Sequence, residues 1–116
     1  MTILESLEKN KVVRSFIVQD IKNFTAGFYL KICISLIDDT KLFVREFSSI
    51  DKRDYSYHWQ KVSGELICRW DNAPYHKEFA TFPHHKHFEN KILPSSEITV
   101  DDVLKIISDS ILKASS

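Results

Sequence analysis

The chain has 116 residues, of which 43% are hydrophobic and 28% charged, and its 16 basic and 16 acidic side chains cancel. This length predicts a single domain over residues 1–116, long enough for a modest core of its own. The composition excludes an intrinsically disordered chain. Zero net charge excludes an electrostatic field of the whole molecule that attracts nucleic acid, so any contact with RNA or DNA must depend on a local patch.

The two cysteines, Cys33 and Cys68, follow no metal-binding spacing, and each lies in an apolar stretch. We therefore expect buried free thiols in a reducing cytoplasm. The first residues lack the long apolar core of a signal peptide, and no apolar run reaches the ~18 residues that a membrane helix needs. These observations predict a cytoplasmic protein that does not span a membrane.

Residues 3–9 predict a short helical turn, and the β-branched, apolar residues from 12 to 21 predict a strand. The inward-facing positions of this strand are expected to be Val13, Phe16 and Val18. The clearest strand follows at 28–37, where apolar residues alternate with others at the period of two that is typical of a half-buried strand. Its inward-facing residues are expected to be Phe28, Leu30, Ile32, Ile34 and Leu36.

The polar tripeptide 38–40 predicts a tight turn, and residues 41–47 predict a strand that runs back along the previous one. Two more strands are predicted at 54–60 and 65–70, joined by a short connection in which Gly64 is able to adopt a positive φ. Five strands with short connections predict an antiparallel meander.

Residues 71–96 contain all three prolines and show little periodicity, which predicts a long structured loop. A helix is predicted to follow, with Thr99 as its N-cap and Asp102 three residues later, close to a capping box. Its apolar stripe consists of Val100, Val103, Leu104, Ile107, Ile111 and Ala114. The predicted fold class is α+β: a curled antiparallel sheet of about five strands with a C-terminal helix packed on one face.

All the histidines of the chain lie between residues 58 and 87, close in sequence to Arg69, Asp71 and Asn72. They are His58, His76, His84, His85 and His87. A single histidine is usually an ordinary surface or loop residue, but this density favours a shared role. Two such roles compete: a metal site, and acid–base chemistry on a phosphodiester.

The metal hypothesis depends on the segment HHKH at 84–87. Zinc needs three or four ligands, and the further ligands would come from His76, His58 or Asp71. No HExxH spacing occurs, and the charge of Lys86 between the candidate ligands repels a dication. We therefore expect no cofactor and keep zinc as the alternative.

The acid–base hypothesis needs one imidazole to take a proton and another to give one, which histidine does near neutral pH. RNA supplies its own nucleophile, the 2′-hydroxyl, so this cleavage requires no metal. The planar guanidinium of Arg69 suits a phosphate whose charge grows during the reaction. Asp71 is suited to orient an imidazole, and Asn72 to fix the loop or bind a base edge.

Four blocks of the sequence resemble the TumE family of bacterial and archaeal toxin–antitoxin proteins. The blocks are VREF (44–47), YSYHWQ (55–60), RWDNAPYH (69–76) and TFPHHKH (81–87). The resemblance extends over about residues 28–110. It implies the toxin of a two-gene module, a cognate helix-turn-helix antitoxin as partner, and RNA as the target.

The family's motif residues are carried over position by position. They are Tyr57, His58, Trp59, Gln60, Arg69, Trp70, Asp71, Asn72, Pro74, His76, His84, His85 and His87. Where the family has two histidines after the proline, this chain has Tyr75 and then His76, so only the second histidine of that pair is present.

Residues and resemblance together predict a metal-independent endoribonuclease toxin. The general base would be His58 or His85, and the general acid His76 or His87. The expected catalytic cluster is His58, Arg69, Asp71, His76, His84, His85 and His87. The expected substrate-binding residues are Tyr57, Trp59, Gln60, Asn72, Lys86 and Glu46. The alternatives are a non-catalytic module that binds nucleic acid or protein, and a zinc-binding hydrolase; a homodimer is one assembly to consider.

Overall fold

Seven strands form one antiparallel meander in the computed structural model, which describes residues 2–73 and 82–114. Each strand pairs with its neighbours in the chain, in the order β1 to β7. The elements are α1 (Ile3–Lys9), β1 (Val13–Phe24), β2 (Gly27–Leu36), β3 (Lys41–Ser48), β4 (Arg53–Gln60), β5 (Leu66–Asp71), β6 (His85–Phe88), β7 (Lys91–Pro94) and α2 (Val100–Ala114). The predicted α+β class and the meander are therefore confirmed.

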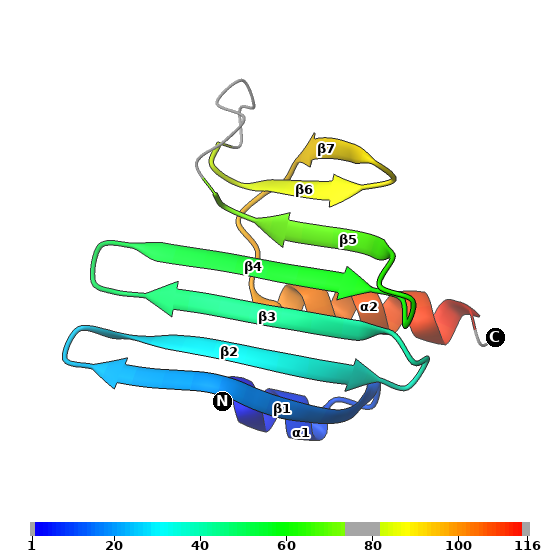
Figure 1. Ribbon diagram of the computed structural model, residues 1–116, viewed down its shortest axis with the longest axis horizontal. Coiled ribbons are helices and arrows are strands. Elements are labelled where there is room, and N and C mark those ends of the chain that lie inside the picture. The colour runs from blue at the N-terminus through cyan, green and yellow to red at the C-terminus, as the bar shows by residue number, and fades with distance from the viewer. Residues whose placement is uncertain (1, 74–81, 115–116) are drawn as a thin grey trace.

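The two helices lie on the same face of the sheet, behind the strands in Figure 1. This face, here called the helix face, carries the hydrophobic core. The opposite face, here called the open face, is not covered by any described helix. Because side chains alternate along each strand, every second residue of the sheet faces the core and the others face the open side.

The sheet has seven strands rather than about five, and it does not close on itself. The two additional strands, β6 and β7, lie in the segment that was expected to be a loop. A two-residue turn joins them, in which Glu89 and Asn90 both have a positive φ, of 52° and 62°. Turns of this kind match the twist of antiparallel strands, but glutamate is a rare residue at such a position. The strands are also only four residues long, too short for an alternating pattern to be recognised.

The core confirms the period-two pattern of β2, since Leu30, Ile32, Ile34 and Leu36 are all buried. Val18 of β1 is the register partner of the buried Ile32, so it faces the core side as expected, but it remains exposed there. It lies on an edge strand next to a β-bulge, between Val18 and Asp20, where the pairing with β2 shifts.

Helix α2 begins with the predicted capping box. The Thr99 backbone N–H donates to Asp102 Oδ2 at 3.0 Å, and the Asp102 N–H donates to Thr99 Oγ1 at 3.3 Å. These hydrogen bonds from Thr99 hold the pKa of Asp102 below its usual value. The buried residues of the helix are Val100, Val103, Leu104, Ile107 and Ile111. Ala114, predicted as the last residue of this stripe, is exposed in the final turn.

Both cysteines are free thiols, as expected. Cys68 is buried, and burial raises the pKa of its thiol to about 11, so it is neutral. Cys33 is only half-buried. Among the described residues, α1 and α2 both fall short of the length and apolar character of a membrane-spanning helix.

Gly27, at the start of β2, provides a test of the packing between β2 and β3. A Cβ atom at this position would overlap the backbone carbonyl oxygen of Ser48. We expect Gly27→Ala to lower the free energy of unfolding by about 2–3 kcal/mol, because the backbone of β3 must move. Chemical denaturation followed by circular dichroism measures this change.

Gly64→Ala is the matched control. Its φ is +94°, and an added Cβ would meet no atom within 4 Å. It is expected to cost roughly 1 kcal/mol, from backbone conformation alone. Equal losses in the two variants would contradict the close approach at Gly27.

Candidate functional site

Three strands bring the predicted site residues together in two parallel rows on the open face. In the first row Arg69 of β5 lies between His58 of β4 and His87 of β6, its register partners. In the second row Asp71 lies between Ser56 and His85. Residues opposite one another in neighbouring strands point to the same side of a sheet, so these side chains form one patch.

Asp71 is the centre of this patch, and its side chain is 9% exposed. Its carboxylate lies 3.1 Å from Arg69 Nε, 2.9 Å from His85 Nε2 and 3.5 Å from His87 Nε2. The backbone N–H of Ala73 also donates to it, at 3.0 Å. A buried carboxylate needs such partners, because unpaired burial of a charge is very costly.

Both ring nitrogens of His85 face acceptors, and the residue is almost completely buried. Nδ1 lies 3.0 Å from the carbonyl oxygen of Pro83, which only accepts, so this nitrogen carries a proton. Nε2 faces the Asp71 carboxylate at 2.9 Å. His85 therefore holds Asp71 in place, and its burial keeps it away from a substrate.

His58 lies beside the guanidinium of Arg69. Nη1 of Arg69 donates to Nδ1 of His58 at 3.3 Å, so in the neutral ring the proton is on Nε2. Burial and the positive charge of Arg69 lower the pKa of His58, although a hydrogen bond with the side chain of Gln60 opposes them. His58 is therefore a neutral base at pH 7, and Gln60 belongs to the same patch.

His87 is the other half-buried histidine of the row, with its side chain 29% exposed. Burial lowers its pKa, the Asp71 carboxylate raises it, and the charges of His85 and Arg69 lower it further, with a net decrease. Asp71 faces Nε2, so Nδ1 is the nitrogen left for other partners. With His58 and His87 neutral, the guanidinium of Arg69 is the cation of this row, and it is suited to an anionic ligand.

A hollow of about 430 Å³ opens beside the patch on the open face. Its lining includes Ser56, Arg69 and Asp71 at one end and Tyr29, Arg45 and Phe47 of β2 and β3 at the other. Arg69 and Asp71 thus border a cavity of the size that binds small molecules or parts of larger ones.

The family model described as Toxin TumE matches residues 3–111. The chain belongs to the TumE toxin family. No curated protein and no solved structure matches it.

The side chains of the TumE motif blocks are divided between the two faces of the sheet. His58, Gln60, Arg69, Asp71, His85 and His87 lie on the open face. Trp59 and Trp70 are buried in the core, on the helix face, where the indole nitrogen of Trp59 donates to Thr40 Oγ1 at 2.9 Å. Lys86 lies opposite Trp70 and so also belongs to the helix face. His76 lies outside the described residues.

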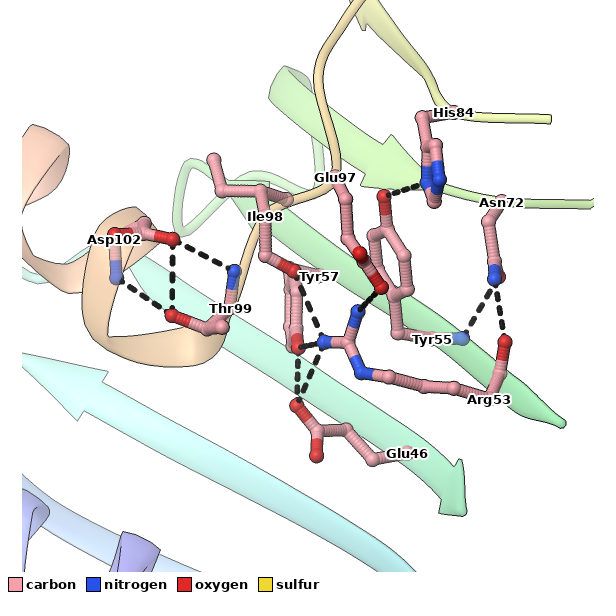
Figure 2. A network of polar contacts seen from close by, with 10 residues as sticks. All are labelled: Glu46, Arg53, Tyr55, Tyr57, Asn72, His84, Glu97, Ile98, Thr99 and Asp102. Atoms are coloured by element: carbon pink, nitrogen blue, oxygen red, sulfur yellow. Dashed lines mark hydrogen bonds and ion pairs between the residues drawn. The ribbon is translucent and has the colours of Figure 1, made fainter. Parts of the chain in front are cut away.

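Four further expected site residues, Glu46, Tyr57, Asn72 and His84, belong to a separate polar network around Arg53 (Figure 2). Arg53 donates to the Tyr57 hydroxyl at 2.9 Å, and it lies 3.7 Å from Glu46, to which the Tyr57 hydroxyl donates. The Tyr55 hydroxyl forms a hydrogen bond of 2.9 Å with Nδ1 of His84. Burial raises the pKa of Tyr55 to about 12, so its hydroxyl is neutral.

This network joins the sheet to the segment that leads into α2. Arg53 forms an ion pair with Glu97 at 3.0 Å and donates to the carbonyl oxygen of Ile98 at 3.0 Å. The side chain of Asn72 donates to the Arg53 carbonyl oxygen at 2.6 Å and accepts from the Tyr55 N–H at 2.9 Å. Asn72 thus fixes the end of β5 beside the start of β4. Nothing in the sequence pattern had drawn attention to Arg53.

The pairing of Arg69 with His58 gives a prediction for the pKa of this histidine. The guanidinium disfavours the imidazolium, so its removal in Arg69→Gln is expected to raise the pKa of His58. An NMR pH titration of the ring proton on Cε1 measures the shift. Lys105→Gln, which removes a cation from exposed α2, should leave this pKa unchanged; an unchanged value in Arg69→Gln would contradict the pairing.

Proposed function

We propose that this TumE toxin is an endoribonuclease that acts by metal-independent acid–base chemistry. The observation that supports it is the row His58, Arg69, His87, in which two partly exposed histidines lie on either side of one guanidinium. Strand spacing places the two histidine backbones roughly 10 Å apart, so a phosphate bound at Arg69 lies within reach of both rings.

His58 is the proposed general base, because burial and Arg69 keep it neutral. A phosphate that binds the guanidinium of Arg69 takes the hydrogen bond that Nδ1 of His58 now accepts. The freed lone pair then removes the proton of the 2′-hydroxyl, and the 2′-oxygen forms a bond to phosphorus. Arg69 stabilises the charge that grows on the phosphate oxygens.

His87 is the proposed general acid. The Asp71 carboxylate beside Nε2 and the bound phosphate both favour its imidazolium form. Its Nδ1 proton is transferred to the 5′-oxygen as the bond between this oxygen and phosphorus breaks. The products are a 2′,3′-cyclic phosphate and a free 5′-hydroxyl. Asp71 orients His87, and His85 holds Asp71.

Membership of a toxin family indicates an antitoxin partner. We propose that this partner is a helix-turn-helix protein encoded next to the toxin and that the toxin acts on RNA in the cytoplasm.

A zinc-dependent hydrolase is the second candidate, and one observation favours it. Single ligand atoms of Asp71, His85 and His87 lie within 4.8 Å of one another. His85 donates from Nδ1 to the Pro83 carbonyl, the arrangement that usually orients a metal-binding Nε2. Nε2 of His85, with Asp71 and His87, would then hold the zinc ion.

RNA cleavage by wild-type toxin in EDTA separates the two candidates. The metal-independent enzyme retains its rate in EDTA and leaves 2′,3′-cyclic phosphate ends, which mass spectrometry identifies. Loss of activity in EDTA, with recovery on addition of zinc, would transfer the assignment to the Asp71–His85–His87 metal site.

His58→Ala and His87→Ala are each expected to reduce the cleavage rate by roughly 100-fold or more, since each removes one proton-transfer step. His84→Gln is the matched control, because its ring lies on the helix face against Tyr55. Circular dichroism confirms that each variant is folded. Full cleavage by both open-face variants, or a loss in His84→Gln equal to theirs, would refute the assignment.

A further inference from the structure

The open face of β2 and β3 carries aromatic side chains that no described element covers. Tyr29 and Phe47 are register partners, and the ring of Phe47 stacks on that of Phe24 with centroids 5.7 Å apart. Phe43, further along β3, lies edge-on to the ring of His58, with centroids 6.3 Å apart. All but Phe24 are half-buried, so their rings present partial faces to solvent. Aromatic residues grouped on an uncovered sheet are typical of a binding surface.

Cations lie among these rings, although the chain as a whole is neutral. Lys31 and Arg45 are register partners, directly beside Tyr29 and Phe47 along their strands, and both are exposed. Neither forms an ion pair within residues 2–73 and 82–114. Lys22 extends over the Tyr29 ring at 5.6 Å and pairs with Asp20 at 3.6 Å, and Lys52, which lines the hollow, pairs with Asp54 at 3.3 Å. This part of the open face therefore combines flat apolar surfaces with two cations, Lys31 and Arg45, that are available to an anion.

The same hollow joins the aromatic residues to the catalytic row. It is lined by Tyr29, Arg45 and Phe47 and reaches Ser56, Arg69 and Asp71. From β2 to β5 the sheet spans about 14 Å. A chain of nucleotides whose phosphate binds Arg69 must therefore continue across β3 and β2.

We propose that Tyr29, Phe47, Lys31 and Arg45 form a platform that binds single-stranded RNA next to the bond to be cleaved. The proposal rests on the endoribonuclease function and names its substrate class. Bases stack on Tyr29 and Phe47, and Lys31 and Arg45 bind the phosphates between them. Single strands are required because a duplex hides the base faces inside its stack. The positive charges of Lys31 and Arg45 favour the polyanion RNA over a protein ligand at this face.

The test measures binding separately from cleavage. A fluorescent RNA of about 12 nucleotides with 2′-O-methyl groups keeps its bases and phosphates but lacks the nucleophile, so wild-type toxin binds it without cutting. Fluorescence anisotropy gives its Kd. We expect the double variant Tyr29→Leu, Phe47→Leu, which keeps apolar bulk but removes both rings, to weaken binding at least about 30-fold.

Arg45→Gln tests the phosphate contact. It is expected to weaken binding and to reduce the slope of log Kd against log salt concentration by about 0.7. Two matched controls lie away from the platform: Phe88→Ala removes a partly exposed ring on β6, and Lys105→Gln removes a cation on α2. Both should retain the wild-type Kd within about twofold. Thermal unfolding shows whether each variant is folded.

The outcomes distinguish the platform from the enzyme. Normal Kd values in the leucine double variant and in Arg45→Gln would overturn the platform even if the toxin cleaves RNA. Equal affinity for a duplex of the same length would also overturn it. If the double variant loses affinity for the antitoxin but not for RNA, the face is a protein interface and the proposal is wrong. Tight platform-dependent binding by a wild-type toxin that cleaves no RNA would instead refute the endoribonuclease and support the platform.

Discussion

The candidate site depends on one buried carboxylate, that of Asp71, at the end of β5. Its charge is compensated by Arg69, His85 and the Ala73 backbone N–H. Each of these partners is held in turn: Arg69 by its place between two strands, and His85 by the Pro83 carbonyl. Removing any one partner leaves charge without compensation in a poorly hydrated position. Asp71 thus fixes the direction in which Arg69 and His87 present their nitrogen atoms.

Much of the fold follows from local patterns in the sequence. The strand β2 and the helix α2 were predicted correctly, because the alternation in β2 and the apolar stripe of α2 each follow from a single buried face. The hairpin of β6 and β7 escaped detection because its strands are short and its turn contains Glu89, which side-chain preferences do not place at a positive φ. Tertiary pairing with β5 decides its structure, and that pairing is not visible in the local sequence.

The histidine cluster was visible as a density of residues, but its division between two faces was not. His84 and His85 are adjacent, and the pleat sends their rings to opposite sides of the sheet. This alternation puts His84 against Tyr55 on the helix face and His85 against Asp71 on the open face. The register of β6 with β5 was needed to make this assignment. Arg53 could not be predicted for a similar reason, since its partners are as far away in sequence as Glu97 and Ile98.

The meander has a consequence for how the molecule assembles. All the strand pairings of the described sheet join neighbours in the chain, and most of the hairpins close only a short loop, the longest connection being residues 72–84 between β5 and β6. The entropy lost at each closure is therefore modest. Chains with mostly local contacts fold faster than those that must first unite distant segments. The proposed catalytic row requires only β4, β5 and β6, which are consecutive. Such a toxin can reach its folded structure by pairing neighbouring strands one after another, from one end of the sheet to the other.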